Sequence, residues 1–362
     1  MTDLVFSFLT ALMLVIIATP ALIKVAKLKH LVDEPGDERK LHRRSVPTIG
    51  GIMIFAGTII GYCLWFPSSS AGDLGQNYEV LGALQEFKFL IASMFILFFL
   101  GLKDDIIGVS PTKKLLIHLV VAFILVMMAD IRITQFWGLF FIDDKLPFWL
   151  SVAFSVFVYI VIVNAINLID GVDGLAAGIG FIAAMTFAFW FYGTGDLPLA
   201  LLATSLGGSL AGFLFYNWNP AKIFMGDSGS LIIGVVIYVL AVRMIEFPMD
   251  QLPGRMSVVS KPVLAMAILA YPLIDTLRVF IKRTIQGRSP FSADKNHIHH
   301  KLLSLGIGHV GTSLILYSFT IFIILLTFFT PAHTPNFSLA VVGGSAVLLT
   351  NIVFMIKRKS NK

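Results

Sequence analysis

The chain has 362 residues, of which 57% are hydrophobic and only 13% are charged. A soluble domain carries about 25% charged residues, so this composition excludes an ordinary water-soluble protein. The single cysteine, Cys63, excludes a disulfide framework and a cysteine-based metal site. The formal net charge of +6 does not indicate nucleic-acid binding, because in membrane proteins Lys and Arg mark the cytoplasmic side.

Apolar runs recur along the whole chain. About 20 helical residues cross the hydrocarbon core of a bilayer, and the period-two alternation of a β-barrel is absent. We therefore predict one all-α polytopic membrane domain over residues 1–362, with about eleven (10–11) transmembrane helices. The spans are expected near residues 5–26, 48–66, 88–103, 113–130, 147–167, 175–193, 197–217, 228–246, 262–282, 311–330 and 337–356.

The basic residues predict the orientation. With an odd number of spans, the two ends of the chain lie on opposite sides of the membrane. If the C-terminus is inside, the inside segments hold 21 of the 27 Lys and Arg residues and the outside segments hold the other 6. This bias predicts an outside N-terminus and a cytoplasmic C-terminus. The cytoplasmic loops are then expected near residues 27–47, 104–113, 168–174, 218–228 and 283–310.

Five carboxylates occur at predicted helix ends on the cytoplasmic side, and ionisable groups at the membrane are functional candidates. They are Asp104, Asp105, Asp170, Asp173 and Asp227. If they share one site, their repulsion raises the pKa of some of them. A hard cation such as Mg²⁺ or Mn²⁺, held by carboxylate and amide oxygens, would relieve that repulsion. The alternative is that each acid only caps or solvates a helix end.

Glycines flank two of these acids. Gly171 and Gly174 flank Asp173. Gly226 and Gly229 flank Asp227 at the start of a predicted span. Glycine lets a backbone approach a phosphate closely, and the free N–H groups of a helix N-terminus attract anions. Tight helix packing is an alternative that explains the glycines but not the acids.

The last cytoplasmic segment carries positive charge and three histidines. These residues are Arg283, His297, His299 and His300. One Arg guanidinium can bind two phosphate oxygens at once. We therefore interpret the segment as a diphosphate-binding site rather than a transition-metal site or a solvated helix face. The first cytoplasmic segment adds Arg39, Lys40 and His42, although basic residues there also attract anionic lipids without any catalytic role.

This set of motifs resembles the polyprenyl-phosphate N-acetylhexosamine-1-phosphate transferases, the superfamily that includes the MraY translocase and the WecA and TagO enzymes. The matching segments occur in the family's order, and the resemblance covers roughly residues 4–354. The segments are Asp104-Asp105, residues 164–174, residues 224–229, residues 289–292 and residues 297–300.

The resemblance implies a Mg²⁺-dependent reaction, with Mn²⁺ as an alternative ion, at the cytoplasmic face of the bacterial inner membrane. UDP-GlcNAc or a related UDP-sugar and undecaprenyl phosphate would give undecaprenyl diphosphate-sugar and UMP, the first membrane step of a cell-envelope polysaccharide pathway. Relatives are often homodimers. By resemblance, Asp104 and Asp105 are catalytic, and Asp227 and Asn167 bind the metal ion. The resemblance assigns binding of the nucleotide-sugar to Asp170, Asp173, Phe224, Arg283, His297, His299 and His300. It assigns binding of the lipid phosphate to Lys113, Lys114, Arg39 and His42.

Two features refine the resemblance. The family's acidic motif often has a third polar residue where this sequence has Gly108, which is the one feature that favours an inactive scaffold. The His-Ile-His-His pattern at 297–300 is typical of the WecA-like branch and favours GlcNAc over the MraY-like transfer of phospho-MurNAc-pentapeptide. An ion-coupled transporter is disfavoured because its polar groups would lie near the midplane.

Two mechanisms are open at the level of sequence. The lipid phosphate attacks the β-phosphorus directly, with an Asp as general base, or an Asp attacks first and forms a covalent intermediate. Direct attack is favoured, because the second pKa of a phosphate is about 6 and little base assistance is needed.

Overall fold

A computed structural model describes residues 1–33, 45–66, 74–254, 256–287 and 297–356, with backbone alone for 74–86. The helices are α1 (Thr2–Leu28), α2 (Gly51–Trp65), α3 (Leu74–Ile107), α4 (Pro111–Phe123), α5 (Phe148–Leu168), α6 (Leu175–Thr194), α7 (Leu197–Asn217), α8 (Gly226–Glu246), α9 (Lys261–Ile268), α10 (Ala270–Ile285), α11 (Ile298–Ser304), α12 (His309–Thr327) and α13 (Pro335–Met355). A π-helical turn (Ile124–Met128) continues α4, a 3₁₀ turn covers Leu139–Phe141, and β1 (Val32–Asp33) pairs with β2 (Val46–Pro47).

The predicted all-α polytopic class is confirmed, but the number of candidate spans is smaller than expected. Within the described residues, eight helices are long and apolar enough to cross a membrane, or nine if the bent pair α9–α10 is one span. The expected span at 48–66 is α2, whose 15 residues reach only about 22 Å at 1.5 Å per residue. The expected span at 88–103 is the second half of the 34-residue α3.

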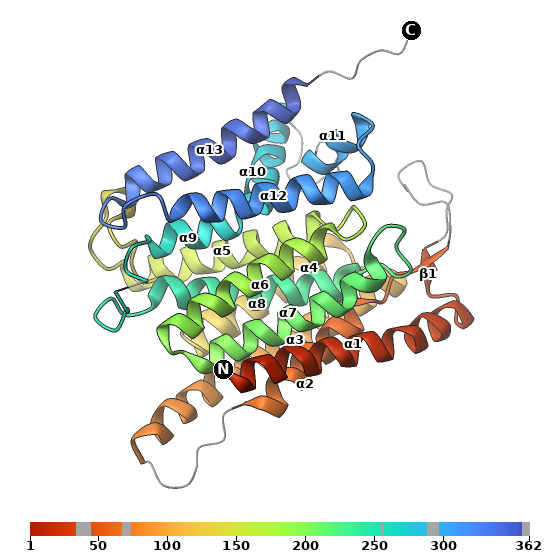
Figure 1. The fold of residues 1–362 in the computed structure, drawn as a ribbon, viewed down its shortest axis with the longest axis horizontal. Coiled ribbons are helices and arrows are strands. Elements are labelled where there is room, and N and C mark those ends of the chain that lie inside the picture. Colours follow the sequence, from red (N-terminus) through yellow and green to blue (C-terminus); the bar gives the residue numbers. More distant parts are fainter. Residues whose placement is uncertain (34–44, 67–73, 255, 288–296, 357–362) are drawn as a thin grey trace.

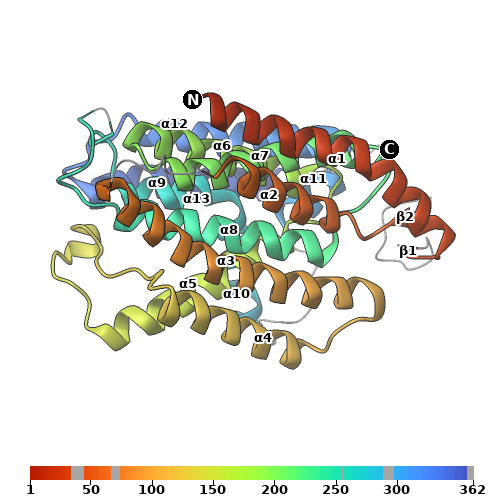
Figure 2. The same cartoon turned by 90° about the horizontal axis from the view of Figure 1, so that it is seen from below.

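The long helices lie side by side along one axis (Figure 1). Seen from below, α8 lies between a layer containing α1, α2, α6 and α7 and a layer containing α3, α4 and α5 (Figure 2). The middle of α8, residues 231–242, is apolar on all sides, as expected for a helix surrounded by protein, and every residue from 228 to 242 is buried. The core of the molecule is therefore built around α8.

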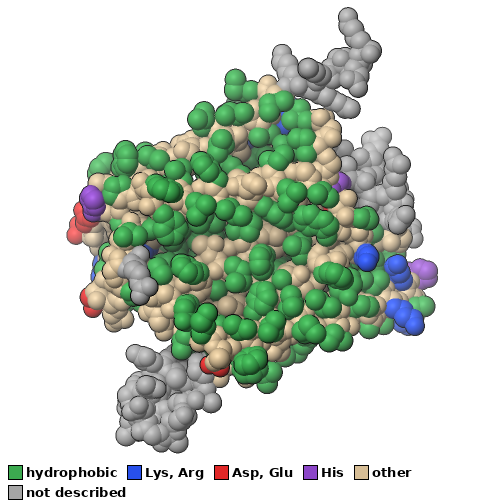
Figure 3. Space-filling model, viewed as in Figure 1, with side chains coloured by type: hydrophobic (Ala, Val, Ile, Leu, Met, Phe, Trp, Pro, Cys, Tyr) green, Lys and Arg blue, Asp and Glu red, His purple; other side chains and the backbone are tan. Residues whose placement is uncertain are grey.

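The surface agrees with a bilayer environment. Hydrophobic side chains cover the middle of the face in Figure 3, and the Lys and Arg side chains visible there gather mainly at the end where α1 finishes. Lipid tails accept such an apolar belt, whereas water would not.

The ninth expected span, 262–282, is not one straight helix. It is broken at Leu269 into α9 and α10, which differ in direction by 74°. Pro272 stands in the first turn of α10. Its ring removes one backbone N–H and clashes with the carbonyl four residues earlier, at Ile268, so the helix cannot continue straight. The break gives α10 its own direction among α5, α12 and α13, which it contacts.

Candidate active site

The N-terminus of α8 is capped by a carboxylate from α3. Asp105 accepts hydrogen bonds from the backbone N–H groups of Asp227 (2.7 Å) and Ser228 (3.1 Å) and from the Ser228 hydroxyl (2.8 Å). N–H groups in the first turn of a helix have no partner within the helix, and a negative charge suits this end of the helix dipole. Asp105 therefore fixes the backbone that carries Asp227.

Glycines make this contact between α3 and α8 possible. Gly226 has φ +70°, and a Cβ there would lie 2.3 Å from the Thr48 carbonyl oxygen and 2.6 Å from both Asp105 oxygens. A Cβ on Gly101 would lie 2.4 Å from backbone atoms of Ser228. These glycines thus serve close packing, and the packing brings the acids together.

Four helices contribute side chains to one cluster around Asp227. Its Oδ1 accepts a hydrogen bond from the Asn167 amide at 2.8 Å, and its Oδ2 forms an ion pair with Lys114. The Lys114 ammonium also lies 3.4 Å from Oδ2 of Asp104. We call Asp104, Lys114, Asn167 and Asp227 the carboxylate–lysine cluster.

The donor atoms of this cluster suit a hard divalent cation. In the described part of the chain, no group of three or more His, Cys, Asp or Glu side chains could hold a metal ion. Mg²⁺, however, is commonly bound through one or two carboxylates, with phosphate and water supplying the other ligands. Asp227 and Asp104 both contact the Lys114 ammonium, and rotation of the Asn167 amide would present its oxygen to an ion at Asp227. The residues therefore fit a magnesium site completed by a substrate phosphate.

The turn between α5 and α6 places a second acid, Asp173, against the α7–α8 loop. Its Oδ2 accepts hydrogen bonds from the Asn219 amide (2.7 Å) and the Ala221 N–H (3.1 Å), and His309 Nδ1 lies 3.5 Å from its Oδ1. Burial raises the pKa of this carboxyl, but His309, Asn219 and Ala221 outweigh burial, so the pKa lies below its ordinary value. Asp173 is a fixed, ionised acceptor.

The third acid of this region, Asp170, has the opposite electrostatics. Burial, followed by the charges of Asp227 and Asp105, raises the pKa of Asp170 to about 7, and the N–H of Gly226 only partly offsets this. The charge of Asp173 acts in the same direction as the other two acids. Such a shift is expected where several carboxylates share one site.

Replacement of Asp170 by Asn changes how stability depends on pH. The folded protein binds the Asp170 proton with a pKa of about 7, against an ordinary value of 3.8, so the free energy of unfolding of the wild type falls as pH rises from about 4 to about 7. The variant lacks this loss. We therefore expect the melting temperature of the variant minus that of the wild type, both measured in detergent with EDTA, to increase as pH rises from about 4 to about 7. A constant difference from pH 4 to 8 contradicts the assignment.

The three histidines of residues 297–300, here called the histidine segment, have different environments. His297 Nδ1 lies 2.8 Å from Oδ2 of Asp275, and His299 Nδ1 lies 3.1 Å from the Tyr271 hydroxyl. Burial, followed by the neighbouring histidines His300 and His297, lowers the pKa of His299 to about 2, so this ring is neutral. His300 is less buried than the other two.

His299 also joins this segment to the α5–α6 turn. A Cβ on Gly171 would lie 3.0 Å from His299 Nε2, so the backbone of the turn packs directly on the imidazole. The absence of a side chain at Gly171 is what permits this approach. The histidine segment and the acids of the turn thus belong to one region of the molecule.

Most of the predicted site residues are brought together. Phe224 joins the β2 region through its backbone, since its N–H donates to Pro47 (2.7 Å) and its carbonyl accepts from Gly50 (3.0 Å). Arg283 is buried on α10. Lys113, by contrast, is exposed on α4 and has no ion pair with the cluster among the described residues. Arg39, His42 and residues 289–292 lie outside the described residues.

Gly108, which replaces the family's third polar residue, has a local role. Its φ is +74°, and its N–H donates to the Asp104 carbonyl at 3.0 Å. This is the left-handed glycine that commonly ends a helix. The next N–H, of Val109, donates to Oδ1 of Asp104 at 2.6 Å. Gly108 therefore helps to orient Asp104 at the end of α3.

Two histidines near these groups were missed from the sequence. His309 contacts Asp173, as described above. His118 lies one turn after Lys114 on α4, is buried, and has its Nδ1 3.2 Å from the Tyr159 hydroxyl. Each is an isolated histidine in an apolar stretch, and the only available signal was the spacing of four residues between Lys114 and His118, which places both on one helix face.

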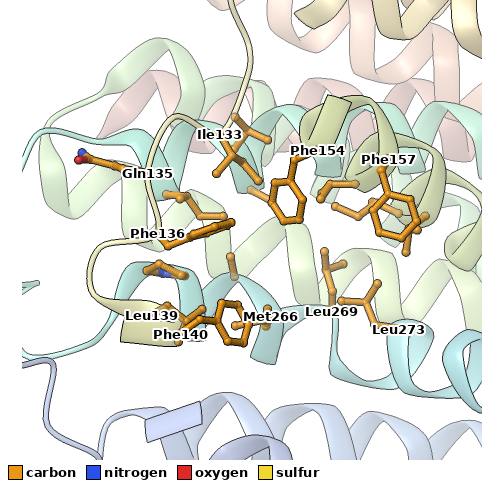
Figure 4. Close-up of a pocket in the computed structure, with 18 residues that line it drawn as sticks. Ile133, Gln135, Phe136, Leu139, Phe140, Phe154, Phe157, Met266, Leu269 and Leu273 are labelled. Atoms are coloured by element: carbon orange, nitrogen blue, oxygen red, sulfur yellow. The ribbon is translucent and has the colours of Figure 1, made fainter. Parts of the chain in front are cut away.

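An apolar cavity of about 240 Å³ lies apart from these polar groups, between α5, α8 and the bend of α9–α10. Phe136, Phe154 and Phe157 contribute rings to its wall (Figure 4). Gln135 is the one polar lining residue and lies at its edge. The lining therefore suits an apolar occupant.

Comparison with known proteins identifies the family. Residues 87–245 match the model of glycosyl transferase family 4. The chain is 34% identical over 319 residues to the probable undecaprenyl-phosphate N-acetylglucosaminyl 1-phosphate transferase of Bacillus subtilis, covering 88% of this chain and 82% of that protein. The chain belongs to glycosyl transferase family 4. The family model extends from α3 to α8 and so includes the whole carboxylate–lysine cluster.

Other similar members of glycosyl transferase family 4 carry related names. The decaprenyl-phosphate N-acetylglucosaminephosphotransferase of Mycolicibacterium smegmatis is 30% identical over 339 residues, which are 88% of this chain and 80% of that protein. The undecaprenyl-phosphate alpha-N-acetylglucosaminyl 1-phosphate transferase of Escherichia coli K12 is 28% identical over 312 residues, 84% of this chain and 77% of that protein. The resemblance inferred from the motifs is confirmed.

Proposed function

We propose that this protein transfers N-acetylglucosamine 1-phosphate from UDP-GlcNAc to undecaprenyl phosphate, releasing UMP. The observation that carries the proposal is the carboxylate–lysine cluster. In it, carboxylates that can bind a divalent cation are in direct contact with a lysine that can bind a phosphate. The names of the relatives support the same donor sugar and a polyprenyl phosphate acceptor.

Asp227 and Asn167 are the proposed ligands of Mg²⁺. When bound, the ion neutralises the diphosphate of the donor and the charge that develops on the UMP leaving group. Asp105 keeps Asp227 in place through the two N–H groups and one hydroxyl described above. Its oxygens are occupied by these bonds, which favours a positioning role for Asp105 over the role of a base.

Lys114 is the proposed anchor of the acceptor phosphate. Its ammonium is shared between Asp104 and Asp227, and it screens the repulsion between two anionic substrates. Asp104 orients Lys114 and is the acid best placed to take a proton from the acceptor. Direct attack of the lipid phosphate on the β-phosphorus is the proposed mechanism, because the second pKa of a phosphate is about 6 and little base assistance is needed. Trapping of a covalent adduct on Asp104 with UDP-GlcNAc alone would overturn direct attack.

The donor nucleotide is proposed to bind between the α5–α6 turn and the α7–α8 loop. Asp173, ionised and held by Asn219 and Ala221, offers a fixed acceptor to the uridine, and Phe224 adjoins the same loop. Arg283 and His300 are proposed to hold the diphosphate and sugar. The MraY-like transfer of a peptide-bearing sugar is the alternative donor reaction.

The apolar cavity is the proposed place for part of the lipid chain. A polyprenyl chain has no polar atoms, which matches a lining with a single polar residue at its edge.

We further propose that the site faces the cytoplasm of a bacterial cell, with the N-terminus outside. The excess of Lys and Arg on the predicted inside supports this orientation.

The test uses detergent-purified protein with undecaprenyl phosphate, Mg²⁺ and UDP-GlcNAc, and it follows UMP release. We expect release that requires the lipid and that EDTA abolishes. Release only with a different UDP-sugar would retain the mechanism and change the donor. Silence with every donor, combined with ion flux in proteoliposomes, would overturn the transferase in favour of a transporter.

A further inference from the structure

One face of α10 supports the histidine segment. Tyr271, Asp275, Val279 and Arg283 recur at intervals of four residues and are all buried. Residues at this spacing lie above one another on a helix. The bend at Leu269 gives this face a direction that a straight α9–α10 helix would not have.

Asp275 is fully buried, with 0% of its surface exposed, and both of its oxygens contact the start of α11. Oδ2 lies 2.8 Å from His297 Nδ1, and Oδ1 accepts a hydrogen bond from the Ile298 N–H, also at 2.8 Å. The N–H of Ile298 opens α11 and has no partner within that helix. A buried carboxylate is tolerated only when such partners satisfy it, so the aspartate and the segment stabilise each other.

The contact with Asp275 determines which nitrogen of His297 carries a proton. A carboxylate is an acceptor, so Nδ1 must donate. Nε2, on the opposite side of the ring, is then directed away from α10. A carboxylate behind a histidine fixes the orientation and tautomer of the ring in this way at many functional sites.

We propose that Asp275 is the positioning residue of the histidine segment, holding His297 so that Nε2 faces the diphosphate-sugar of the donor. This inference rests on the proposed function, in which the segment binds the donor. Asp275 itself does not touch the substrate. It acts through His297 and through the first turn of α11, and it is distinct from the acids of the carboxylate–lysine cluster.

Tyr271 makes a second, different contact from the same face. Its hydroxyl lies 3.1 Å from Nδ1 of His299. The rings of His299 and His297 are stacked, with 5.4 Å between their centroids and 11° between their planes. His299 is 1% exposed and packs on Gly171. Asp275 Oδ2 lies 4.0 Å from His299 Nδ1, beyond hydrogen-bonding distance, but 2.8 Å from His297 Nδ1, so the ring that the carboxylate holds directly is that of His297.

The decisive variant is Asp275→Asn. The amide oxygen still accepts from Ile298, but the amide nitrogen faces His297 Nδ1 and favours the opposite tautomer. We expect kcat/KM for UDP-GlcNAc to fall about 100-fold or more, since loss of an orienting partner costs about 10–100-fold at metal sites and about 10⁴-fold in a catalytic triad. The melting temperature in detergent should change little.

A double-mutant cycle separates positioning from mere packing. If Asp275 acts through His297, the His297→Gln variant loses a similar factor, and adding Asp275→Asn to it costs less than about threefold. Full activity of His297→Gln, or a full additional loss in the double variant, overturns the proposal. His297→Gln leaves the buried carboxylate and its bond to Ile298 in place, so this arm holds even if Asp275→Asn does not fold.

The matched control is Thr276→Val, the neighbouring position on α10. The Thr276 hydroxyl is buried and lacks a hydrogen-bond partner in the described structure, so its removal should leave activity unchanged. The ¹⁵N chemical shifts of labelled histidines report the tautomer without any turnover. We expect His297 to carry its proton on Nδ1 in the wild type and on Nε2 in Asp275→Asn. Failure of transfer with this tautomer change intact would reject the proposed function, and the same tautomer in both proteins would reject the role of Asp275.

Discussion

Replacing Asp227 by Asn lowers lipid-dependent UMP release by at least about a thousandfold. Stabilisation of developing charge by a bound metal ion contributes several kcal/mol, and each 1.4 kcal/mol corresponds to about a factor of ten in rate. The variant keeps the shape of the side chain but removes the charge that binds Lys114 and the proposed cation. The measurement is UMP release at saturating UDP-GlcNAc, over a range of Mg²⁺ concentrations.

The control for Asp227→Asn is Asp144→Asn. Asp144 is exposed in the loop before α5, at the end of that helix opposite to Asn167, and its replacement should leave the rate unchanged. If Asp227→Asn regains the wild-type rate at high Mg²⁺, the carboxylate only strengthens binding of the ion. If it retains more than about a tenth of the rate at low Mg²⁺, the assignment of the metal site is wrong.

Asp105→Ala lowers both the stability and the activity of the protein. It leaves the N–H groups of Asp227 and Ser228 and the Ser228 hydroxyl without their acceptor, and each buried group left unpaired costs about 1–3 kcal/mol. We expect a clear drop in melting temperature together with a loss of UMP release. The start of α8 would no longer be held against α3.

Asp104→Ala is the matched comparison, since Asp104 lies next to Asp105 at the end of the same helix. Its removal frees one N–H, of Val109, and weakens the hold on Lys114. We expect a loss of activity similar to that of Asp105→Ala with a smaller change in melting temperature. Equal destabilisation by the two changes would contradict the division of roles between the two acids.

The membrane class and the meeting of the acids could be predicted from the sequence. The recurring apolar runs predict the helices, and Asp104, Lys114 and Asp227 are predicted to lie on one side because each stands at the end of such a run. Such runs begin and end at the bilayer surface, so their polar ends meet without any knowledge of tertiary contacts. The number of spans was less predictable, because α2 is short and α3 extends well beyond the expected 88–103.

The contacts that determine individual roles were less accessible. Pro272 in an apolar run is a signal for the break in α9–α10, but a proline is also tolerated within transmembrane helices. That Asp105 caps α8, and that Asp275 faces His297, depends on contacts between residues 122 and 22 positions apart. The contact of His309 with Asp173 is likewise invisible in a single sequence, because neither spacing nor composition marks it.

The central position of α8 has a consequence for biosynthesis. A chain that is inserted from its N-terminus delivers α3, α4 and α5, with Asp104, Lys114 and Asn167, before Asp227 has been synthesised. Asp104, Lys114 and Asn167 are therefore in the membrane before Asp227 is available to contact them. The cluster is completed only when α8 inserts among helices that are already present. The histidine segment is synthesised later still, so a chain that stops before residue 297 lacks part of the proposed site.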